Sequence, residues 1–201
     1  MASKMIPNGR IFSVGIDIGR VNDPTAIVVL ELVGRTALHV AKCERLPLGM
    51  PFANQVSQVQ SLLATPTIAL STYGVTVDAT GVGAPVVEMM RAASIQGLMA
   101  LSICSGTGDV RRGTVGKGDL VTGAQIAIQA SCIKANSKMP GVAALVEELR
   151  NYRVKQNAST GNLSWNAREG EHDDLVLALC LSVYRAKLMR APSMFRSARS
   201  V

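Results

Sequence analysis

Residues 11–25 read Ile11-Phe-Ser-Val-Gly-Ile-Asp17-Ile-Gly-Arg-Val-Asn-Asp-Pro-Thr25, a run of apolar residues that one carboxylate interrupts before a polar turn. The β-branched and aromatic residues of this run are typical of a strand that is covered on both faces. An unpaired charge in such a strand would cost several kcal/mol. Asp17 therefore needs a cation, a set of hydrogen-bond donors or water at the open end of the strand. Gly15 and Gly19 leave room for a ligand to approach the backbone.

The composition predicts one globular domain, since 48% of the 201 residues are hydrophobic and 17% are charged. We expect a flexible leader at 1–10, the domain at 11–190 and a basic flexible tail at 191–201. No apolar run is long enough to cross a bilayer and the N-terminus does not resemble a signal peptide, so we expect a cytoplasmic protein that is neither secreted nor membrane-bound. The four cysteines form no Cys-x-x-Cys pair, which indicates reduced thiols rather than a zinc or redox site.

The charge distribution favours a polyanionic partner. The formal net charge is +7, and no acidic residue follows Asp174. The basic residues after that point are Arg185, Lys187, Arg190, Arg196 and Arg199. Aromatic residues make up 3% of the chain, so contacts to backbone phosphates are a better hypothesis than base stacking. For the last residues, a basic tail that is merely solvated is an equally good interpretation.

Hydrophobic periodicity and turn signals predict an α/β fold with a mixed central sheet and helices on both faces. An antiparallel meander of three strands comes first, and parallel strands follow it. The predicted strands are 11–18, 25–33, 36–46, 73–77, 98–104 and a short edge strand at 132–135. The predicted helices are 51–63, 84–93, 119–131, 140–150 and 173–189, the last of them apolar on nearly every side. Residues 105–118 are predicted as a loop, and 152–156 with 162–166 as a hairpin.

Acidic residues stand at three edges of this apolar framework. Asp17 lies in the first strand, Asp78 ends the fourth strand, and Asp173 and Asp174 begin the last helix. Ligands gather at strand ends in doubly covered sheets, so these carboxylates could converge. Clustered carboxylates without His or Cys suit hard cations such as Mg²⁺ or Mn²⁺. Two such ions about 4 Å apart can activate water and stabilise the leaving oxygen in phosphodiester cleavage.

Structural roles compete with these functional ones. Either aspartate of the final pair could cap the helix, and Asp78 could be a turn residue before a glycine loop. His172 could be a metal ligand, a base or a structural residue, and Glu171 could join the metal site or, as we favour, face water. A second set of residues could bind phosphate or simply solvate a loop. This set is Arg111, Arg112 and Lys117.

Five segments in order resemble the C-terminal nuclease domain of the large terminase subunit of tailed bacteriophages and herpesviruses. The segments are Val14-Gly-Ile-Asp-Ile-Gly, Val77-Asp-Ala-Thr-Gly-Val-Gly, Lys117-Gly-Asp-Leu-Val, Leu145-Val-Glu-Glu-Leu and Glu171-His-Asp-Asp-Leu-Val-Leu-Ala-Leu. Each segment is weakly specific alone, and their common order and spacing are more specific. The resemblance spans most of the chain, from residue 11 to residue 186.

The resemblance implies a ribonuclease-H-like fold and a metal-dependent endonuclease that cuts double-stranded viral DNA during genome packaging. It further implies that Asp17, Asp78 and one of the final pair bind two Mg²⁺ or Mn²⁺ ions. We favour Asp174 over Asp173 as the third ligand. The partners that it implies are the terminase ATPase domain, the small terminase subunit and the portal, in the cytoplasm of an infected bacterium.

Several alternatives stay open. The chain carries no Gly-x-x-x-x-Gly-Lys-Ser/Thr phosphate loop, so we expect that it is not the packaging motor. We expect instead either an excised domain or a separately encoded nuclease. The segment Gly15-Ile-Asp-Ile-Gly19 also resembles the first phosphate loop of actin-like and sugar-kinase ATP-binding domains, although that architecture needs two lobes. A Holliday-junction resolvase would differ in its substrate rather than its chemistry. A DNA-binding module with vestigial acidic residues would bind without cutting.

Overall fold

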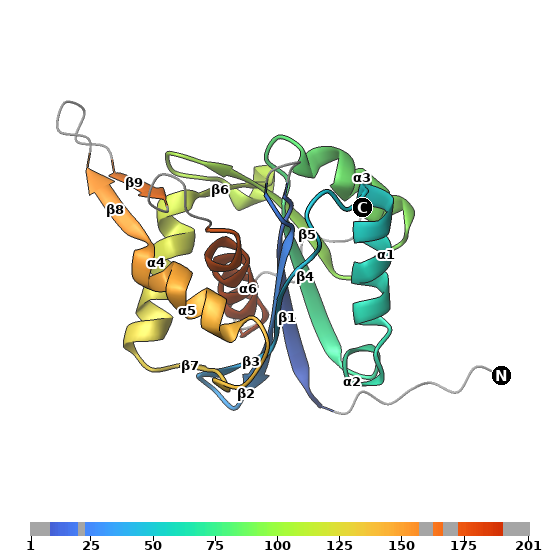
Figure 1. Ribbon diagram of the computed structural model, residues 1–201, viewed down its shortest axis with the longest axis horizontal. Helices are drawn as coiled ribbons and strands as arrows, with labels where there is room; N and C mark the ends of the chain where they lie inside the picture. The colour runs from blue at the N-terminus through green and yellow to red at the C-terminus, as the bar shows by residue number, and fades with distance from the viewer. Residues whose placement is uncertain (1–8, 20–22, 157–162, 167–172, 191–201) are drawn as a thin grey trace.

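The computed structural model describes residues 9–19, 23–156, 163–166 and 173–190. A seven-stranded sheet runs through the middle of the molecule, and helices cover both of its faces (Figure 1). The strand order is β6-β5-β4-β1-β2-β3-β7, so β1 (Ile11–Asp17) lies at the centre. Most of the expected leader and the whole of the expected tail lie outside the described residues.

The sheet has the mixed topology that the sequence predicted. The meander continues from β1 through β2 (Ala26–Val33) to β3 (Ala37–Arg45), and each of these strands is antiparallel to the one before it. Three parallel strands extend the other side of β1. These are β4 (Thr72–Asp78), β5 (Leu98–Cys104) and β6 (Thr114–Gly116). At the far edge β7 (Ile133–Lys134) pairs in parallel with β3, and β8 (Arg153–Gln156) and β9 (Leu163–Asn166) form a separate hairpin.

The helices form two layers (Figure 1). The first layer is α1 (Phe52–Leu63) and α3 (Gly83–Ala92), with the single turn α2 (Pro66–Ala69) beside them. The second layer is α4 (Lys117–Gln129), α5 (Val142–Asn151) and α6 (Asp174–Arg190). None of the described helices is both long and apolar enough to cross a membrane.

The predicted loop at 105–118 is wrong in part, because it contains a short 3-10 helix, Val110–Arg112, and the strand β6. A strand of three residues that ends on a glycine is too short to show the alternation by which a strand is recognised. The single turn α2 was also missed, for the same reason of length.

The residues of β1 alternate between the two faces of the sheet, as a strand requires. Phe12, Val14 and Ile16 are buried in the core that lies under α1 and α3. Ser13 and Gly15 instead contact α6 on the other face. The nearly uniform hydrophobicity of α6 follows from its position, because it packs on β1, β2 and β4 and is covered by α4 and α5 (Figure 1).

Two of the basic residues of α6 serve the fold. The Arg185 guanidinium donates to the carbonyl oxygen of Gly97 at 3.1 Å. Arg190 donates to the carbonyl oxygens of Thr36 and Ala37 at 2.9 and 2.7 Å. These two side chains fasten α6 to strand ends and turns, so part of the positive charge after Asp174 has a structural role.

Candidate metal centre

Asp17 and Asp78 end two neighbouring parallel strands at the same edge of the sheet. Ile16 pairs with Val77 between β1 and β4, and the two aspartates are the next residues of their strands. Convergence of the two carboxylates requires these strands to be neighbours, and they are. Both carboxylates therefore lie at the carboxyl ends of the strands, where open α/β sheets bind ligands.

A close seam between β1 and α6 brings the final aspartate pair to the same edge. Ser13 and Ser182 exchange hydrogen bonds across the seam, and a Cβ at Gly15 would lie 2.0 Å from a carbonyl oxygen of α6. Two residues of a strand advance about 6.6 Å and four residues of a helix about 6 Å. Gly15 contacts Ala178, so two residues further along β1 and four residues back along α6 bring Asp17 level with Asp174, where α6 begins.

The pKa of Asp17 responds to the other three aspartates of this edge. Burial raises the pKa of Asp17 well above its usual value, and repulsion from Asp78, Asp174 and Asp173 raises it further. The positive charge of Lys117 acts in the opposite direction. A cluster of this kind attracts either protons or cations, because several carboxylates cannot ionise together without cost.

The Asp78 carboxylate is fixed by the loop that follows it. Its Oδ1 accepts a hydrogen bond from the backbone N–H of Thr80 at 2.8 Å. Burial raises the pKa of Asp78, and the contacts with Thr80 and the charge of Lys117 oppose this rise. The turn interpretation and the functional one are therefore compatible, since the turn orients the side chain.

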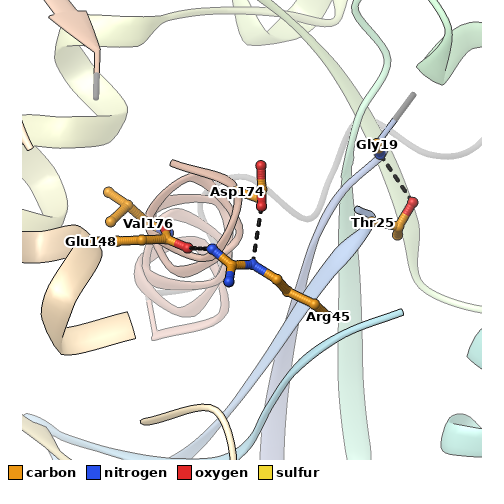
Figure 2. Close-up of polar contacts among 6 residues, drawn as sticks. All are labelled: Gly19, Thr25, Arg45, Glu148, Asp174 and Val176. Carbon is orange, nitrogen blue, oxygen red and sulfur yellow. Dashed lines mark hydrogen bonds and ion pairs between the residues drawn. The ribbon is translucent and has the colours of Figure 1, made fainter. Parts of the chain in front are cut away.

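The two aspartates at the start of α6 have different surroundings. The Asp174 side chain is 7% exposed, and its Oδ2 lies 3.1 Å from Nε of Arg45 (Figure 2). The Asp173 side chain is 30% exposed, and its Oδ2 lies 3.7 Å from Nζ of Lys117. The backbone carbonyl of Asp173 also accepts from the N–H of Leu177 at 2.9 Å, so this residue begins the helical hydrogen bonding.

Arg45 and Glu148 belong to this edge although the sequence analysis assigned them no role. The Arg45 guanidinium bridges the carboxylates of Asp174 and Glu148 (Figure 2). Burial raises the pKa of Glu148 to about 7, against the effect of its contacts with Val176 and Arg45. The helical spacing could have identified Glu148 as a buried acidic residue, because it follows Leu145 by three residues and so falls on the buried face of its helix.

The proposed DNA-contacting residues divide into two groups. Arg111 and Arg112 lie in the exposed 3-10 helix after β5, with Arg112 Nε 3.6 Å from an Asp109 carboxylate oxygen. Lys117 instead begins α4 beside the aspartates, with its side chain 24% exposed. His172 and Glu171 lie outside the described residues.

The donor set fits a hard divalent cation, because carboxylate oxygens are the ligands that Mg²⁺ and Mn²⁺ prefer. Across the described ranges, no three His, Cys, Asp or Glu side chains are grouped tightly enough to hold a metal ion as they stand.

Solved structures that share this fold include three viral terminase nucleases. The large terminase nuclease from the thermophilic phage G20c, with bound cobalt, is 25% identical, covers 88% of this chain and 81% of its own, and gives a TM-score of 0.67. The nuclease domain of the large terminase of bacteriophage SPP1, with bound Mn, is 10% identical over 87% of this chain and 86% of its own, with a TM-score of 0.57. The human cytomegalovirus terminase nuclease domain is 15% identical over 90% and 87%, with a TM-score of 0.56.

The predicted ribonuclease-H-like fold is thereby confirmed, and so is the resemblance to terminase nuclease domains. No protein-family model matches the chain, and no curated protein sequence matches it either.

Proposed function

We propose that this chain, whose fold is that of the nuclease domains of terminase large subunits, is a divalent-metal-dependent endonuclease that cuts double-stranded DNA during viral genome packaging. The observation that carries the proposal is the convergence of Asp17, Asp78 and the start of α6 at one edge of the sheet. The cobalt bound to the similar phage G20c nuclease supports a metal centre in this fold.

In this proposal Asp17, Asp78 and Asp174 would hold two Mg²⁺ or Mn²⁺ ions, with Asp17 at the centre of the set. Asp173 is the second choice for the third ligand, because its side chain lies at the same helix start but pairs with Lys117. Ions held there supply activation of a water molecule and stabilisation of the leaving oxygen in phosphodiester cleavage. Lys117 balances the carboxylate charge, and the Thr80 turn orients Asp78.

DNA is bound through its phosphates in this proposal. The net charge of +7 attracts the duplex, and Arg111, Arg112 and Lys117 contact the backbone near the carboxylates. By the same likeness, the partners are a terminase ATPase domain, a small terminase subunit and a portal, and the site of action is the cytoplasm of the infected cell.

A plasmid cleavage assay tests the proposal. Supercoiled plasmid is incubated with the wild-type chain in Mg²⁺, Mn²⁺ or EDTA, beside Asp17→Asn and Asp78→Asn. We expect nicking or linearisation that needs the metal and falls by at least about 100-fold in both variants. Glu88→Gln is the matched control, since the Glu88 side chain is exposed on α3 and pairs only with its neighbour Arg91 among the ion pairs described.

Two outcomes of this assay would contradict the proposal. Full metal-dependent cleavage by Asp78→Asn would rule out the three-carboxylate arrangement. If the folded wild-type chain cleaves the plasmid neither in Mg²⁺ nor in Mn²⁺, the chain is not an endonuclease that acts on its own.

A further inference from the structure

We infer that Arg45 and Glu148 are positioning residues of the metal centre and together hold the Asp174 carboxylate at the edge where Asp17 and Asp78 meet. This inference rests on the proposed function and adds residues that the carboxylate pattern does not contain. Arg45 ends β3, Glu148 lies on α5 and Asp174 begins α6, so three separate elements meet here (Figure 2).

The sheet register aims Arg45 at this site. Asp17 pairs with Ala26 between β1 and β2, and Ala26 pairs with Arg45 between β2 and β3. Residues that pair directly across neighbouring strands project to the same face of a sheet. Arg45 therefore lies on the α6 face, about 10 Å and two strand spacings from Asp17. Ala26 lies between Asp17 and Arg45, and its small side chain leaves room there for the start of α6.

The contacts form a closed loop around the first turn of α6. Arg45 Nε lies 3.1 Å from Asp174 Oδ2, and Arg45 Nη2 donates to Glu148 Oε1. Glu148 Oε2 in turn accepts the backbone N–H of Val176 at 3.0 Å. One carboxylate on α5 thus holds both the guanidinium and the backbone that carries Asp174. This arrangement restrains the side chain and the rotation of the helix end together.

A purely structural role accounts poorly for this choice of residues. Asp174 and Glu148 are buried, and a buried ion pair is often no more stabilising than apolar residues of the same volume. Carboxylates that ligate metals are, by contrast, usually held by hydrogen bonds from outside the ligand set. Loss of such a partner typically weakens metal binding by about 10–100-fold.

The test compares Mn²⁺ binding, measured by calorimetry and by the Mn²⁺ paramagnetic resonance signal, in two charge-neutral double variants. Arg45→Gln with Glu148→Gln removes the network, and Arg10→Gln with Glu31→Gln removes a different Arg–Glu pair, whose Arg10 Nε lies 2.6 Å from Glu31 Oε1. Both variants keep the net charge of +7, so bulk attraction of the cation does not change. We expect Mn²⁺ binding about 10–100-fold weaker in the first and unchanged in the second.

A single variant, Arg45→Lys, guards against misfolding of the double variant. Lysine keeps the charge but lacks the planar fork that contacts two carboxylates at once. We expect its Mn²⁺ affinity to fall in the same direction, and cleavage to recover at saturating Mn²⁺. A role in stability alone would not move the half-saturating Mn²⁺ concentration of a folded variant.

The remaining outcomes overturn the inference. Mn²⁺ binding equal to that of the wild type, in either folded variant, would show that the network does not position Asp174. Tighter binding would show that Arg45 competes with the metal. If the wild-type chain binds no Mn²⁺, the proposed function fails and the inference fails with it, whereas normal wild-type binding with normal variants refutes the inference alone.

Discussion

Ser13 on β1 and Ser182 on α6 exchange two hydrogen bonds in the core. The Ser13 hydroxyl donates to the Ser182 carbonyl at 2.6 Å, and the Ser182 hydroxyl donates to the Ser13 carbonyl at 2.9 Å. Both side chains are fully buried. Because β1 carries Asp17 and α6 carries Asp174, this pair fixes the longitudinal register of the two elements that supply carboxylates.

Gly15→Ala is expected to break this register. The added Cβ would lie 2.0 Å from the carbonyl oxygen of Ala178 and 2.5 Å from the backbone nitrogen of Ser182, so α6 must move. Overpacking of this kind costs about 1–3 kcal/mol or more of the free energy of unfolding, which urea denaturation measures. Gly106→Ala is the control, because nothing lies within 4 Å of its Cβ position. Equal stability of Gly15→Ala and the wild type would disprove the tight seam.

Asp17→Asn is expected to stabilise the metal-free chain while abolishing metal binding. The neighbouring carboxylates and burial both disfavour the ionised Asp17, and an amide removes that charge. The amide is neutral at every pH, so the free energy of unfolding of the metal-free variant at neutral pH should be higher than that of the wild type. Thermal melting in EDTA measures the change, and Glu88→Gln should leave the melting temperature unaltered. A lower melting temperature would contradict the electrostatic account.

The metal-free chain is expected to lose stability as the pH rises. The pKa values of Asp17, Asp78 and Glu148 are raised in the folded state, so the folded chain binds protons more tightly than the unfolded chain. For Glu148 the stabilisation is present below pH 4.5 and is lost as the pH rises to about 7. Urea denaturation in EDTA across this window measures the slope.

Asp17→Asn serves as the control for this pH dependence, because it removes one of the raised groups and should flatten the slope. Glu31, whose pKa is lowered by Arg10, contributes the opposite trend, and only as the pH falls below about 4.5. A free energy of unfolding that rises between pH 4.5 and pH 7 would contradict the assignment for Glu148.

The sequence predicted the carboxylate edge because its signals are local. Asp17 interrupts a strand of apolar residues, and Asp78 ends another strand before a glycine loop. Each feature is visible within a few residues, whereas the pairing of β1 with β4 is a long-range contact that only the structure shows. The mixed sheet was predictable in the same way, since its long strands and helices show clear periodicity.

Arg45 was not predictable, because its role depends on contacts far apart in sequence. It pairs with Glu148, 103 residues away, and with Asp174, 129 residues away. No spacing rule connects such positions, and an arginine at the end of an exposed-looking strand usually faces water. The structural use of Arg185 and Arg190 was missed for the same reason, since the carbonyl groups that they bind come from distant strand ends and turns.

The salt dependence of DNA binding provides the last prediction. Replacing Arg111 and Arg112 by alanine should weaken DNA binding equally for all sequences. It should also make the salt dependence shallower, reducing the magnitude of the slope of log affinity against log salt by roughly 2, since each phosphate contact contributes about 0.9. Fluorescence anisotropy of a labelled duplex in EDTA at several salt concentrations measures this slope. Arg35, exposed in the turn between β2 and β3, and Arg91, exposed in the last turn of α3, provide a charge-matched alanine control that should retain the wild-type slope. An unchanged slope in the first variant would remove the 3-10 helix from the DNA contact.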